Sequence, residues 1–179
     1  MSSTNGNVID KEVYPTPPSV VAALLNAIHF RESDRFLEPC RAEGNIYHPV
    51  NLPEHQKEWA EIRMGRDYLS HDFGGKFDVI ITNPPFSLTE EFLSKSLSEL
   101  AVDGTLCYLQ RVNFLGSKKR VPFWQRIGFP NKTPIIVPRP RFVGGGSDSC
   151  EYSWLIWDRG DRVQLPIGLS HLISVEVPA

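Results

Sequence analysis

The chain has 179 residues, of which 41% are hydrophobic and 22% charged, and a formal net charge of -2. This balance is ordinary for one globular domain, and it excludes a globally basic coat for nucleic acid while leaving room for a local basic patch. The three cysteines form no CxxC pair and the five histidines have no metal-ligand spacing, so we expect neither disulfides nor a bound metal. No apolar run approaches the roughly 18 residues that span a bilayer, and the start of the chain lacks a signal pattern, so we expect a cytoplasmic protein with no membrane partner.

The first part of the chain predicts a helix and a short strand. We expect residues 1–12 to form a polar tail and residues 13–179 to form a single domain. Apolar residues recur at three- and four-residue spacing over residues 20–28, after two prolines, which predicts an amphipathic helix. Residues 35–39 predict a short strand that stops at a proline, and Gly44 predicts a turn.

The middle of the chain alternates between strand and helix patterns. Residues 58–62 predict a second strand, and residues 65–69 follow so closely that little room is left for a helix. The β-branched run at residues 77–82 is typical of a strand buried on both faces, and a Pro-Pro pair ends it. Helical spacing returns over residues 88–100, and an Asp-Gly pair introduces a strand over residues 105–112.

The last part of the chain predicts a loop and two paired strands. Residues 116–132 are rich in glycine, proline and basic residues, and we expect them to form a loop. Residues 134–142 and 151–158 predict two strands joined by a glycine-rich connection at residues 144–147, which favours an antiparallel hairpin. The alternation of strands and helices predicts an α/β fold, with a mostly parallel central sheet completed by this C-terminal hairpin.

Four polar residues lie at or just after the ends of predicted strands or their turns: Glu38, Glu61, Asp67 and Asn83. In an open α/β sheet, ligands bind beyond the carboxyl ends of the strands, near the point where the strand order reverses. We therefore expect one cleft to collect these side chains. The alternative for each acidic residue taken alone is a solvated cap.

Asn83-Pro84-Pro85-Phe86 is the most specific motif in the chain. An aromatic amine such as adenine N6 is a poor nucleophile, because its lone pair is delocalised into the ring. The side-chain oxygen of Asn83 and the carbonyl of Pro84 can accept hydrogen bonds from such an amine and favour a pyramidal nitrogen. The prolines restrict the loop, and Phe86 offers a face on which a planar base can stack. The alternative is a Pro-Pro turn that merely ends a strand.

This motif directly follows the strand predicted at residues 77–82. In this arrangement, residues 13–158 resemble the N6-adenine DNA methyltransferases, particularly the small phage-type enzymes with an NPPF or NPPY motif. The resemblance implies a Rossmann-like methyltransferase fold, with S-adenosylmethionine as the cofactor and DNA as the partner. It also implies that an adenine base flips out of DNA against Phe86. The catalytic residues implied in this way are Asn83, Pro84, Pro85 and Phe86.

Other segments resemble the cofactor motifs of that family. Thr16, in Tyr14-Pro15-Thr16-Pro17, resembles the threonine that helps to hold the methionine carboxylate. Residues 36–45 resemble the glycine-rich loop, with Ala42 in the place of one glycine. Glu61 is similar to the acidic residue that binds the ribose hydroxyls, and Asp67 to the aspartate that binds the adenine amino group. The cofactor contacts implied in this way are Tyr14, Thr16, Glu38, Pro39, Cys40, Gly44, Glu61, Asp67, Tyr68 and Asn83.

A basic segment follows the predicted central strands. Residues 116–132 carry five basic residues and no acidic one, interleaved with aromatic residues. Basic side chains engage phosphates, and aromatic rings stack on bases, so we expect this segment to contact DNA. The alternative is a solvated loop whose aromatic residues pack on the core. With two arginines that the family resemblance adds, the predicted DNA-binding residues are Lys118, Lys119, Arg120, Trp124, Arg126, Arg139 and Arg141.

Two other functions are compatible with the sequence. Methyltransferases that act on protein glutamine, and some that act on RNA, use the same Asn-Pro-Pro-aromatic device on an amide or amino nitrogen. A non-catalytic binding module with a methyltransferase-like fold is a further alternative, because Ala42 replaces a glycine and the chain from Glu61 to Asp67 is short. The oligomeric state is left open.

Overall fold

The computed structural model describes residues 14–142, 150–165 and the backbone of residues 171–173. Within them, seven strands form one sheet in the order β2-β1-β3-β4-β6-β5-β7. The strands are β1 (Phe36–Glu38), β2 (Lys57–Trp59), β3 (Phe77–Thr82), β4 (Leu100–Arg111), β5 (Ile135–Val137), β6 (Tyr152–Asp158) and β7 (His171–Ile173). The α-helices are α2 (Pro18–Leu25), α3 (Thr89–Glu99) and α4 (Val121–Ile127). Short 3-10 helices are η1 (Glu54–Gln56), η2 (Ile62–Met64), η3 (Phe86–Leu88), η4 (Val112–Phe114) and η5 (Lys118–Arg120).

The sheet is mostly parallel, as the sequence predicts. β2, β1, β3 and β4 pair in parallel, and β6 then pairs antiparallel with both β4 and β5. The predicted antiparallel pairing is confirmed for β5 and β6, with Ile135 opposite Ser153, but β5 ends at Val137 and does not extend to residue 142 as predicted. The glycine-rich connection proposed at residues 144–147 lies outside the described residues. β7 pairs in parallel with β5, which the sequence did not predict.

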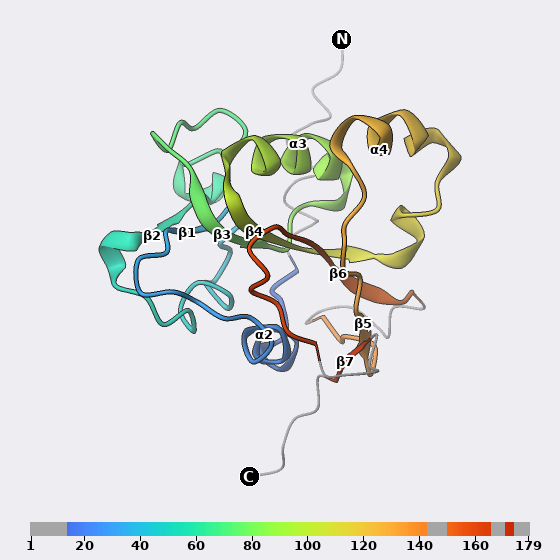
Figure 1. The fold of residues 1–179 in the computed structure, drawn as a ribbon, viewed down its shortest axis with the longest axis horizontal. Coiled ribbons are helices and arrows are strands. Elements are labelled where there is room, and N and C mark those ends of the chain that lie inside the picture. Colours follow the sequence, from blue (N-terminus) through green and yellow to red (C-terminus); the bar gives the residue numbers. More distant parts are fainter. Residues whose placement is uncertain (1–13, 143–149, 166–170, 174–179) are drawn as a thin grey trace.

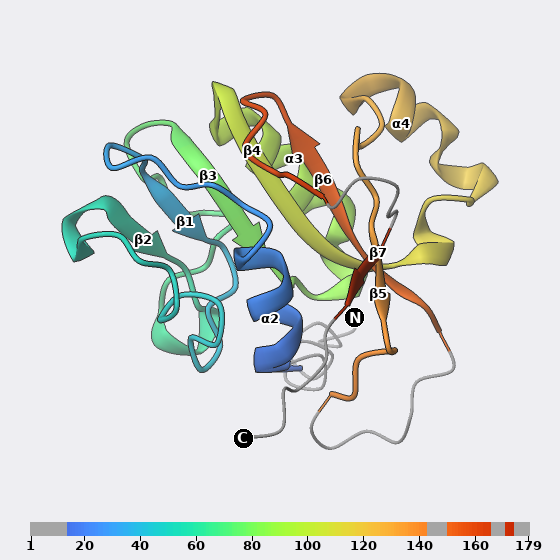
Figure 2. The same cartoon turned by 60° about the horizontal axis from the view of Figure 1, so that its bottom comes forward.

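Each face of the sheet is covered by helices. Figure 1 shows α3 and α4 on one face and α2 on the other, and Figure 2 shows the strands fanning between them. Because successive side chains of a strand point to opposite faces, Val79 and Ile81 pack in the core on the α2 side, whereas Ile80 packs on the α3 side. The interior of the sheet is thus buried on both faces, as the continuous apolar pattern of β3 predicts.

Three further predicted boundaries were wrong. β2 ends at Trp59, so Glu61 lies after the strand and not inside it. β4 begins at Leu100, and the Asp103-Gly104 pair lies within it. A Cβ at Gly104 would lie 2.8 Å from the Leu100 side chain, so glycine permits the strand to bend closely over Leu100. The predicted loop at residues 116–132 contains η5 and α4, because apolar side chains of α4 are buried beside α3.

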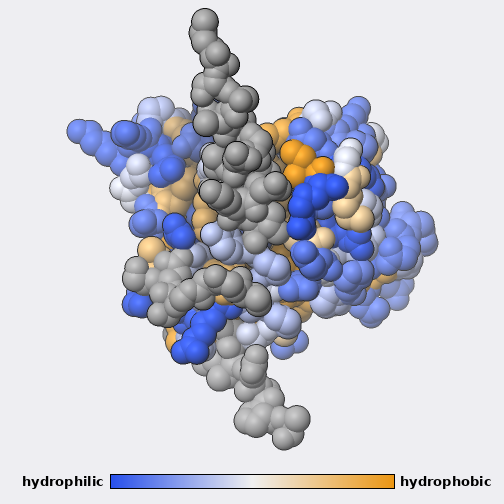
Figure 3. All heavy atoms as spheres, turned by 180° about the vertical axis from the view of Figure 1, so that it is seen from behind, coloured by the Kyte–Doolittle hydropathy of each residue, from blue (hydrophilic) through white to orange (hydrophobic). Residues whose placement is uncertain are grey.

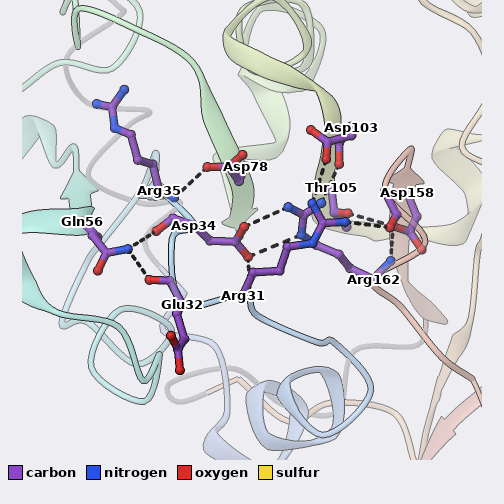
Figure 4. Close-up of polar contacts among 11 residues, drawn as sticks. Arg31, Glu32, Asp34, Arg35, Gln56, Asp78, Asp103, Thr105, Asp158 and Arg162 are labelled. Atoms are coloured by element: carbon purple, nitrogen blue, oxygen red, sulfur yellow. Dashed lines mark hydrogen bonds and ion pairs between the residues drawn. The ribbon is translucent and has the colours of Figure 1, made fainter.

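A buried ionic cluster lies at the amino ends of the parallel strands (Figure 4). Arg162 and Asp34, whose side chains are 1% and 2% exposed, form an ion pair of 2.8 Å. Asp158 accepts hydrogen bonds from the Thr105 hydroxyl and from the backbone N–H groups of Arg162 and Val163. The cluster joins the segment before β1 to the segment after β6.

The outer surface is chemically mixed. Figure 3 shows hydrophilic residues over much of the face seen from behind, with small hydrophobic patches between them. Large hydrophobic side chains with exposed surface include Met64 on the segment after β2, Val121 on α4 and Phe129 after α4.

Candidate active site

A cleft that is open to solvent lies at the carboxyl ends of β1, β2 and β3. This is the position at which ligands bind in open α/β sheets. Glu38 ends β1, Glu61 follows β2, and Asn83 follows β3, so three distant parts of the chain meet there. The lining residues are Tyr14, Pro15, Thr16, Glu38, Cys40, Arg41, Ala42, Glu43, Asn45, Ile46, Glu61, Ile62, Asn83 and Pro85.

Two asparagines hold the start of the described chain against the cleft. The side-chain nitrogen of Asn83 donates to the carbonyl of Tyr14 at 2.8 Å, and that of Asn45 donates to the carbonyl of Thr16 at 2.9 Å. We call residues 14–16 the strap. Since the amide nitrogen of Asn83 faces the strap, its oxygen is the atom left to accept a hydrogen bond from a ligand.

The turn after β1 has a left-handed backbone at two positions. Gly44 has φ +84°, and a Cβ there would lie 2.5 Å from the ring of His48, so glycine is required at this position. Ala42 has φ +46°, although alanine rarely adopts this region. Its N–H donates to Glu61 Oε2 at 2.8 Å, which anchors the turn to the segment after β2. Ala42 therefore takes a glycine-like conformation at the position where the family resemblance expects glycine.

Glu61 is a buried, ionised carboxylate at the rim of this turn. Burial would raise the pKa of Glu61, but hydrogen bonds from Arg63 and from the backbone N–H of Ala42 outweigh burial and lower its pKa. Oε1 accepts from the backbone N–H and the Nε of Arg63, and Oε2 accepts from Ala42. A carboxylate offers about four acceptor positions, so Oε2 keeps one for a ligand hydroxyl.

Glu38 is the most deeply buried acidic group in the cleft. Its residue is 1% exposed, and Oε2 has no hydrogen-bond partner among the described residues. Burial raises the pKa of Glu38 to about 9, opposed by the backbone N–H of Tyr47 and by the charge of Arg41. At neutral pH the carboxyl is therefore protonated. An unpartnered polar atom of this kind in the lining of a cleft is suited to a hydrogen bond with a polar ligand.

The structure brings six of the predicted cofactor residues to the cleft and leaves four outside its lining. Tyr68 is 2% exposed and donates its hydroxyl to Glu99 at 2.8 Å, so it belongs to the core beside α3. The carboxylate of Asp67 accepts from Leu69 N–H and Ser70 Oγ and caps its own turn. The six residues in the lining are Tyr14, Thr16, Glu38, Cys40, Glu61 and Asn83, and the four outside it are Pro39, Gly44, Asp67 and Tyr68.

Some lining residues were missed by the sequence analysis. Asn45, which holds the strap, and Arg41, Glu43, Ile46 and Ile62 were not among the predicted contacts. Four of the five adjoin predicted positions in the chain, and Ile46 lies two residues from Gly44, so this proximity is the signal that could have found them. Cys40 lines the cleft as a thiol, because burial raises its pKa strongly.

A buried chain of hydrogen bonds supports the Asn83-Pro84-Pro85-Phe86 loop. The carbonyl of Phe86 accepts from the hydroxyl of Thr89 at 2.9 Å, and that hydroxyl accepts from the side-chain nitrogen of Gln110 at 2.8 Å. The side-chain oxygen of Gln110 in turn accepts from the backbone N–H of Arg111 at 2.8 Å. Thr89 and Gln110 are each 2% exposed. These bonds fix the loop to β4, so that its acceptors are held in place.

The ring of Phe86 lies among aromatic and basic side chains. Tyr152 lies 6.2 Å from it, centroid to centroid, at an interplanar angle of 40°, and Phe142 lies 5.1 Å from Tyr152. Tyr14 of the strap contacts Phe142 edge-on at 6.1 Å. The guanidinium of Arg111 stands over the Phe86 ring at 5.0 Å. Phe86 is only partly buried, so this aromatic group reaches the surface beside the cleft.

The basic segment is partly folded onto the core. Trp124 is 8% exposed and packs against Phe114 at 5.5 Å and Phe129 at 4.7 Å, so its ring is occupied by core contacts. This packing matches the alternative interpretation for Trp124. Phe129 is 54% exposed beside a shallow pocket of η5 and α4.

The predicted basic residues have different environments. Lys118 and Lys119 are exposed on η5. Arg120 pairs with Glu90 at 3.1 Å and covers the ring of Phe114. Among the remaining predicted residues, Arg126 lies over Phe123, Arg139 pairs with Glu151, and Arg141 is exposed.

Solved structures share this fold at low sequence identity. A protein described as a class I S-adenosylmethionine-dependent methyltransferase from Listeria monocytogenes is 16% identical, with a TM-score of 0.58, and the match covers 88% of this chain and 64% of that one. A modification subunit described as part of a type I restriction enzyme from Vibrio vulnificus is 13% identical, with a TM-score of 0.62, covering 92% and 50%. A methyltransferase from Pyrococcus furiosus is 14% identical, with a TM-score of 0.52, covering 88% and 91%.

These similarities define the fold as that of the Rossmann-like S-adenosylmethionine-dependent methyltransferases. The chain spans about two thirds of the Listeria chain and half of the Vibrio chain. No protein-family model and no curated protein sequence matches this chain. Among the described residues, no helix has the length and hydropathy to cross a membrane, and no group of three or more His, Cys, Asp or Glu side chains is arranged to hold a metal ion.

Proposed function

We propose that the protein transfers a methyl group from S-adenosylmethionine to the exocyclic N6 of adenine in DNA. The observation that carries this proposal is the orientation of Asn83 at the mouth of the cleft. Its amide nitrogen is engaged by the carbonyl of Tyr14, and its oxygen is therefore directed to accept from a substrate amine. When bound, S-adenosylmethionine supplies an electrophilic methyl group on a sulfonium.

The residues of the cleft fit this cofactor in charge and shape. Glu61 retains one acceptor position for a ribose hydroxyl, since its other positions are used by Ala42 and Arg63. Glu38 places an unpartnered oxygen of a neutral carboxyl in the same cleft, where a polar group of the ligand can form a hydrogen bond with it. The left-handed turn at Ala42 and Gly44 lets the backbone approach a ligand closely. Together these contacts support a ligand that carries ribose hydroxyls and further hydrogen-bonding groups, as S-adenosylmethionine does.

Asn83 and Pro84 act on the substrate amine. The Asn83 oxygen and the Pro84 carbonyl accept hydrogen bonds from the two N–H groups, which localises the lone pair on nitrogen. With these acceptors in place, the amine nitrogen would take up the methyl group that the bound cofactor supplies and would then lose one proton to solvent. The hydrogen bonds from Thr89 and Gln110 hold the loop during this step. Phe86 provides an aromatic surface for the planar base.

Adenine in DNA is the favoured substrate for two reasons. The exposed Lys118 and Lys119 can engage phosphates, and the partly exposed ring of Phe86 suits a nucleobase. In addition, structures with this fold include modification subunits of type I restriction enzymes, such as the Vibrio protein. RNA and protein glutamine present similar nitrogens, and a direct assay distinguishes them.

The test is transfer of label from methyl-labelled S-adenosylmethionine to DNA, RNA or cell protein, each supplied separately. We expect label in DNA, and nuclease digestion should recover it as N6-methyladenine. Label found only in protein or RNA would contradict DNA as the substrate but would still support methyl transfer to a nitrogen. Absence of transfer, together with absence of cofactor binding by calorimetry, would favour a non-catalytic binding module.

A further inference from the structure

The guanidinium of Arg111 covers one face of the Phe86 ring. Its guanidinium carbon lies 5.0 Å from the ring centroid, and both residues are partly buried, so the contact is at the surface. Arg111 ends β4, and Phe86 begins η3 after β3, so two neighbouring strands deliver the pair to the same edge of the sheet. A planar ligand that stacks on the face covered by Arg111 must therefore displace the guanidinium.

The guanidinium is positioned by a second contact. Arg111 Nε donates to the hydroxyl of Tyr152 at 3.2 Å, and the two residues are directly opposite in the antiparallel pairing of β4 with β6. Tyr152 itself lies beside the Phe86 ring. The backbone of Arg111 is fixed through Gln110, whose side-chain oxygen accepts its N–H. The backbone of Arg111 is thus held by the same buried chain of bonds as the Phe86 loop.

Arginine is chemically suited to exchange places with a nucleobase. Its guanidinium is planar and stacks on aromatic faces, as a base does, and it also binds phosphate through paired N–H groups. In the exchange, stacking of the base on Phe86 replaces the cation–π contact, and a phosphate oxygen replaces the Tyr152 hydroxyl as an acceptor for the guanidinium. The released guanidinium then remains tethered within reach of the nucleotide whose base has entered.

We propose that Arg111 holds the face of Phe86 on which the substrate base stacks, and that it exchanges places with this base by moving to the adjoining phosphate. Arg111 is then a positioning residue for the substrate nucleotide. It keeps the aromatic surface covered until a base arrives, and it contacts the phosphate afterwards. The inference rests on the proposed function, because it takes a nucleobase as the substrate.

The direct test follows the Nε–H signal of Arg111 by nuclear magnetic resonance. Excess S-adenosylhomocysteine fills the cofactor cleft, and the Arg111→Lys variant identifies the signal by its loss. We expect a short single-stranded oligodeoxyadenylate to move this signal away from its ring-shifted position. A strand of equal length that lacks bases should leave it near that position. A signal that does not move with oligodeoxyadenylate, or that moves equally with both strands, overturns the exchange.

A kinetic test separates positioning from a merely structural role. Arg111→Leu should raise the KM for DNA about tenfold and change kcat much less, since Arg111 contacts the nucleotide and not the reacting nitrogen. The matched control is Arg35→Leu, because Arg35 stands over Phe77 at 4.7 Å near the opposite edge of the sheet. Its KM for DNA should equal that of the wild type.

The two proposals fail in different ways. If the wild type methylates DNA, but Arg111→Leu keeps the wild-type KM and the Arg111 signal stays fixed, this inference alone is wrong. If the wild type neither methylates DNA nor shows shifts with oligodeoxyadenylate, the proposed function is wrong, and the inference falls with it.

Discussion

The side-chain amide of Asn83 donates a hydrogen bond to the main-chain carbonyl of Tyr14 across 2.8 Å, although the two residues are 69 positions apart. This bond determines which way the amide points, because only its nitrogen can donate. It also ties the strap to the loop after β3. A change at Asn83 therefore affects both the proposed acceptor for the substrate amine and one of the two attachments of the strap.

Replacing Asn83 by alanine should lower kcat about 10²- to 10³-fold, the usual effect of removing one oriented polar group from a reacting centre. Affinity for S-adenosylmethionine should change little, because Asn45 still holds the strap at Thr16. Steady-state kinetics and calorimetry measure the two quantities. Asn113→Ala, at an exposed position on η4, is the matched control and should leave both unchanged. Equal losses of turnover and cofactor affinity would show that Asn83 only supports the cleft.

Ala42→Gly should stabilise the protein by about 0.5 to 1 kcal/mol. Glycine removes the strain of the left-handed conformation, which costs roughly 1–2 kcal/mol for other residues, although it also increases the entropy of the unfolded chain. Urea unfolding measures the change. The control is Ala22→Gly, on the exposed side of α2, which should destabilise by about 1 kcal/mol. Loss of stability in both variants would mean that Ala42 is not strained.

Glu38 should make stability depend on pH. Burial raises the pKa of Glu38 from 4.5 to about 9, so between these values the folded protein holds a proton that the unfolded chain releases. The contribution of Glu38 to stability is complete below pH 4.5 and is lost as the pH rises towards 9, by at most about 1.4 kcal/mol per pH unit.

Urea unfolding of the wild type and of Glu38→Gln across this pH range checks the effect. The amide cannot ionise, so the wild type should lose stability relative to the variant as the pH rises. Glu43→Gln, at an exposed glutamate of the same cleft, should give a difference that does not vary with pH above neutrality. A constant difference for Glu38→Gln as well would mean that Glu38 is ionised in the folded protein.

Arg162→Leu should destabilise the fold by about 3–5 kcal/mol, because it leaves the Asp34 carboxylate buried without its partner. The comparison is Arg31→Leu, which breaks an exposed pair with Asp103 and should cost far less, because solvent screens that pair. Thermal or denaturant unfolding measures both. Similar small costs would indicate that water reaches Asp34 once the arginine is removed.

Replacing Lys118 and Lys119 together by alanine should weaken DNA binding for all sequences and reduce the slope of log affinity against log salt by about 2. Both lysines are exposed on η5, so the fold should be unaffected. Lys76→Ala is a control near the amino ends of the strands and should leave the slope unchanged. Binding titrations at several salt concentrations measure the slope. An unaltered slope in the double variant would mean that η5 does not contact DNA.

Local patterns predicted the central elements well. The β-branched run of residues 77–82 became β3 without change, and residues 88–100 became α3 within one residue at each end, because these segments carry their own periodicity. The start of β4 was missed, since it depends on the pairing of Leu100 with Phe77 and on a bend at Gly104. α4 was missed because the burial of Phe123 and Trp124, and not helix spacing, specifies it.

The sequence by itself determined the order of the elements, the mostly parallel sheet and the chemical character of the Asn83-Pro84-Pro85-Phe86 loop, because these follow from local spacing and residue type. Only the tertiary structure decided which side chains face the cleft. Tyr68 lies in the core and donates to Glu99, whereas Asn45 donates to the strap. The guanidinium of Arg111 lies over the ring of Phe86. The direction of each of these side chains is set by contacts with residues distant in the chain, and the local sequence pattern does not predict such contacts.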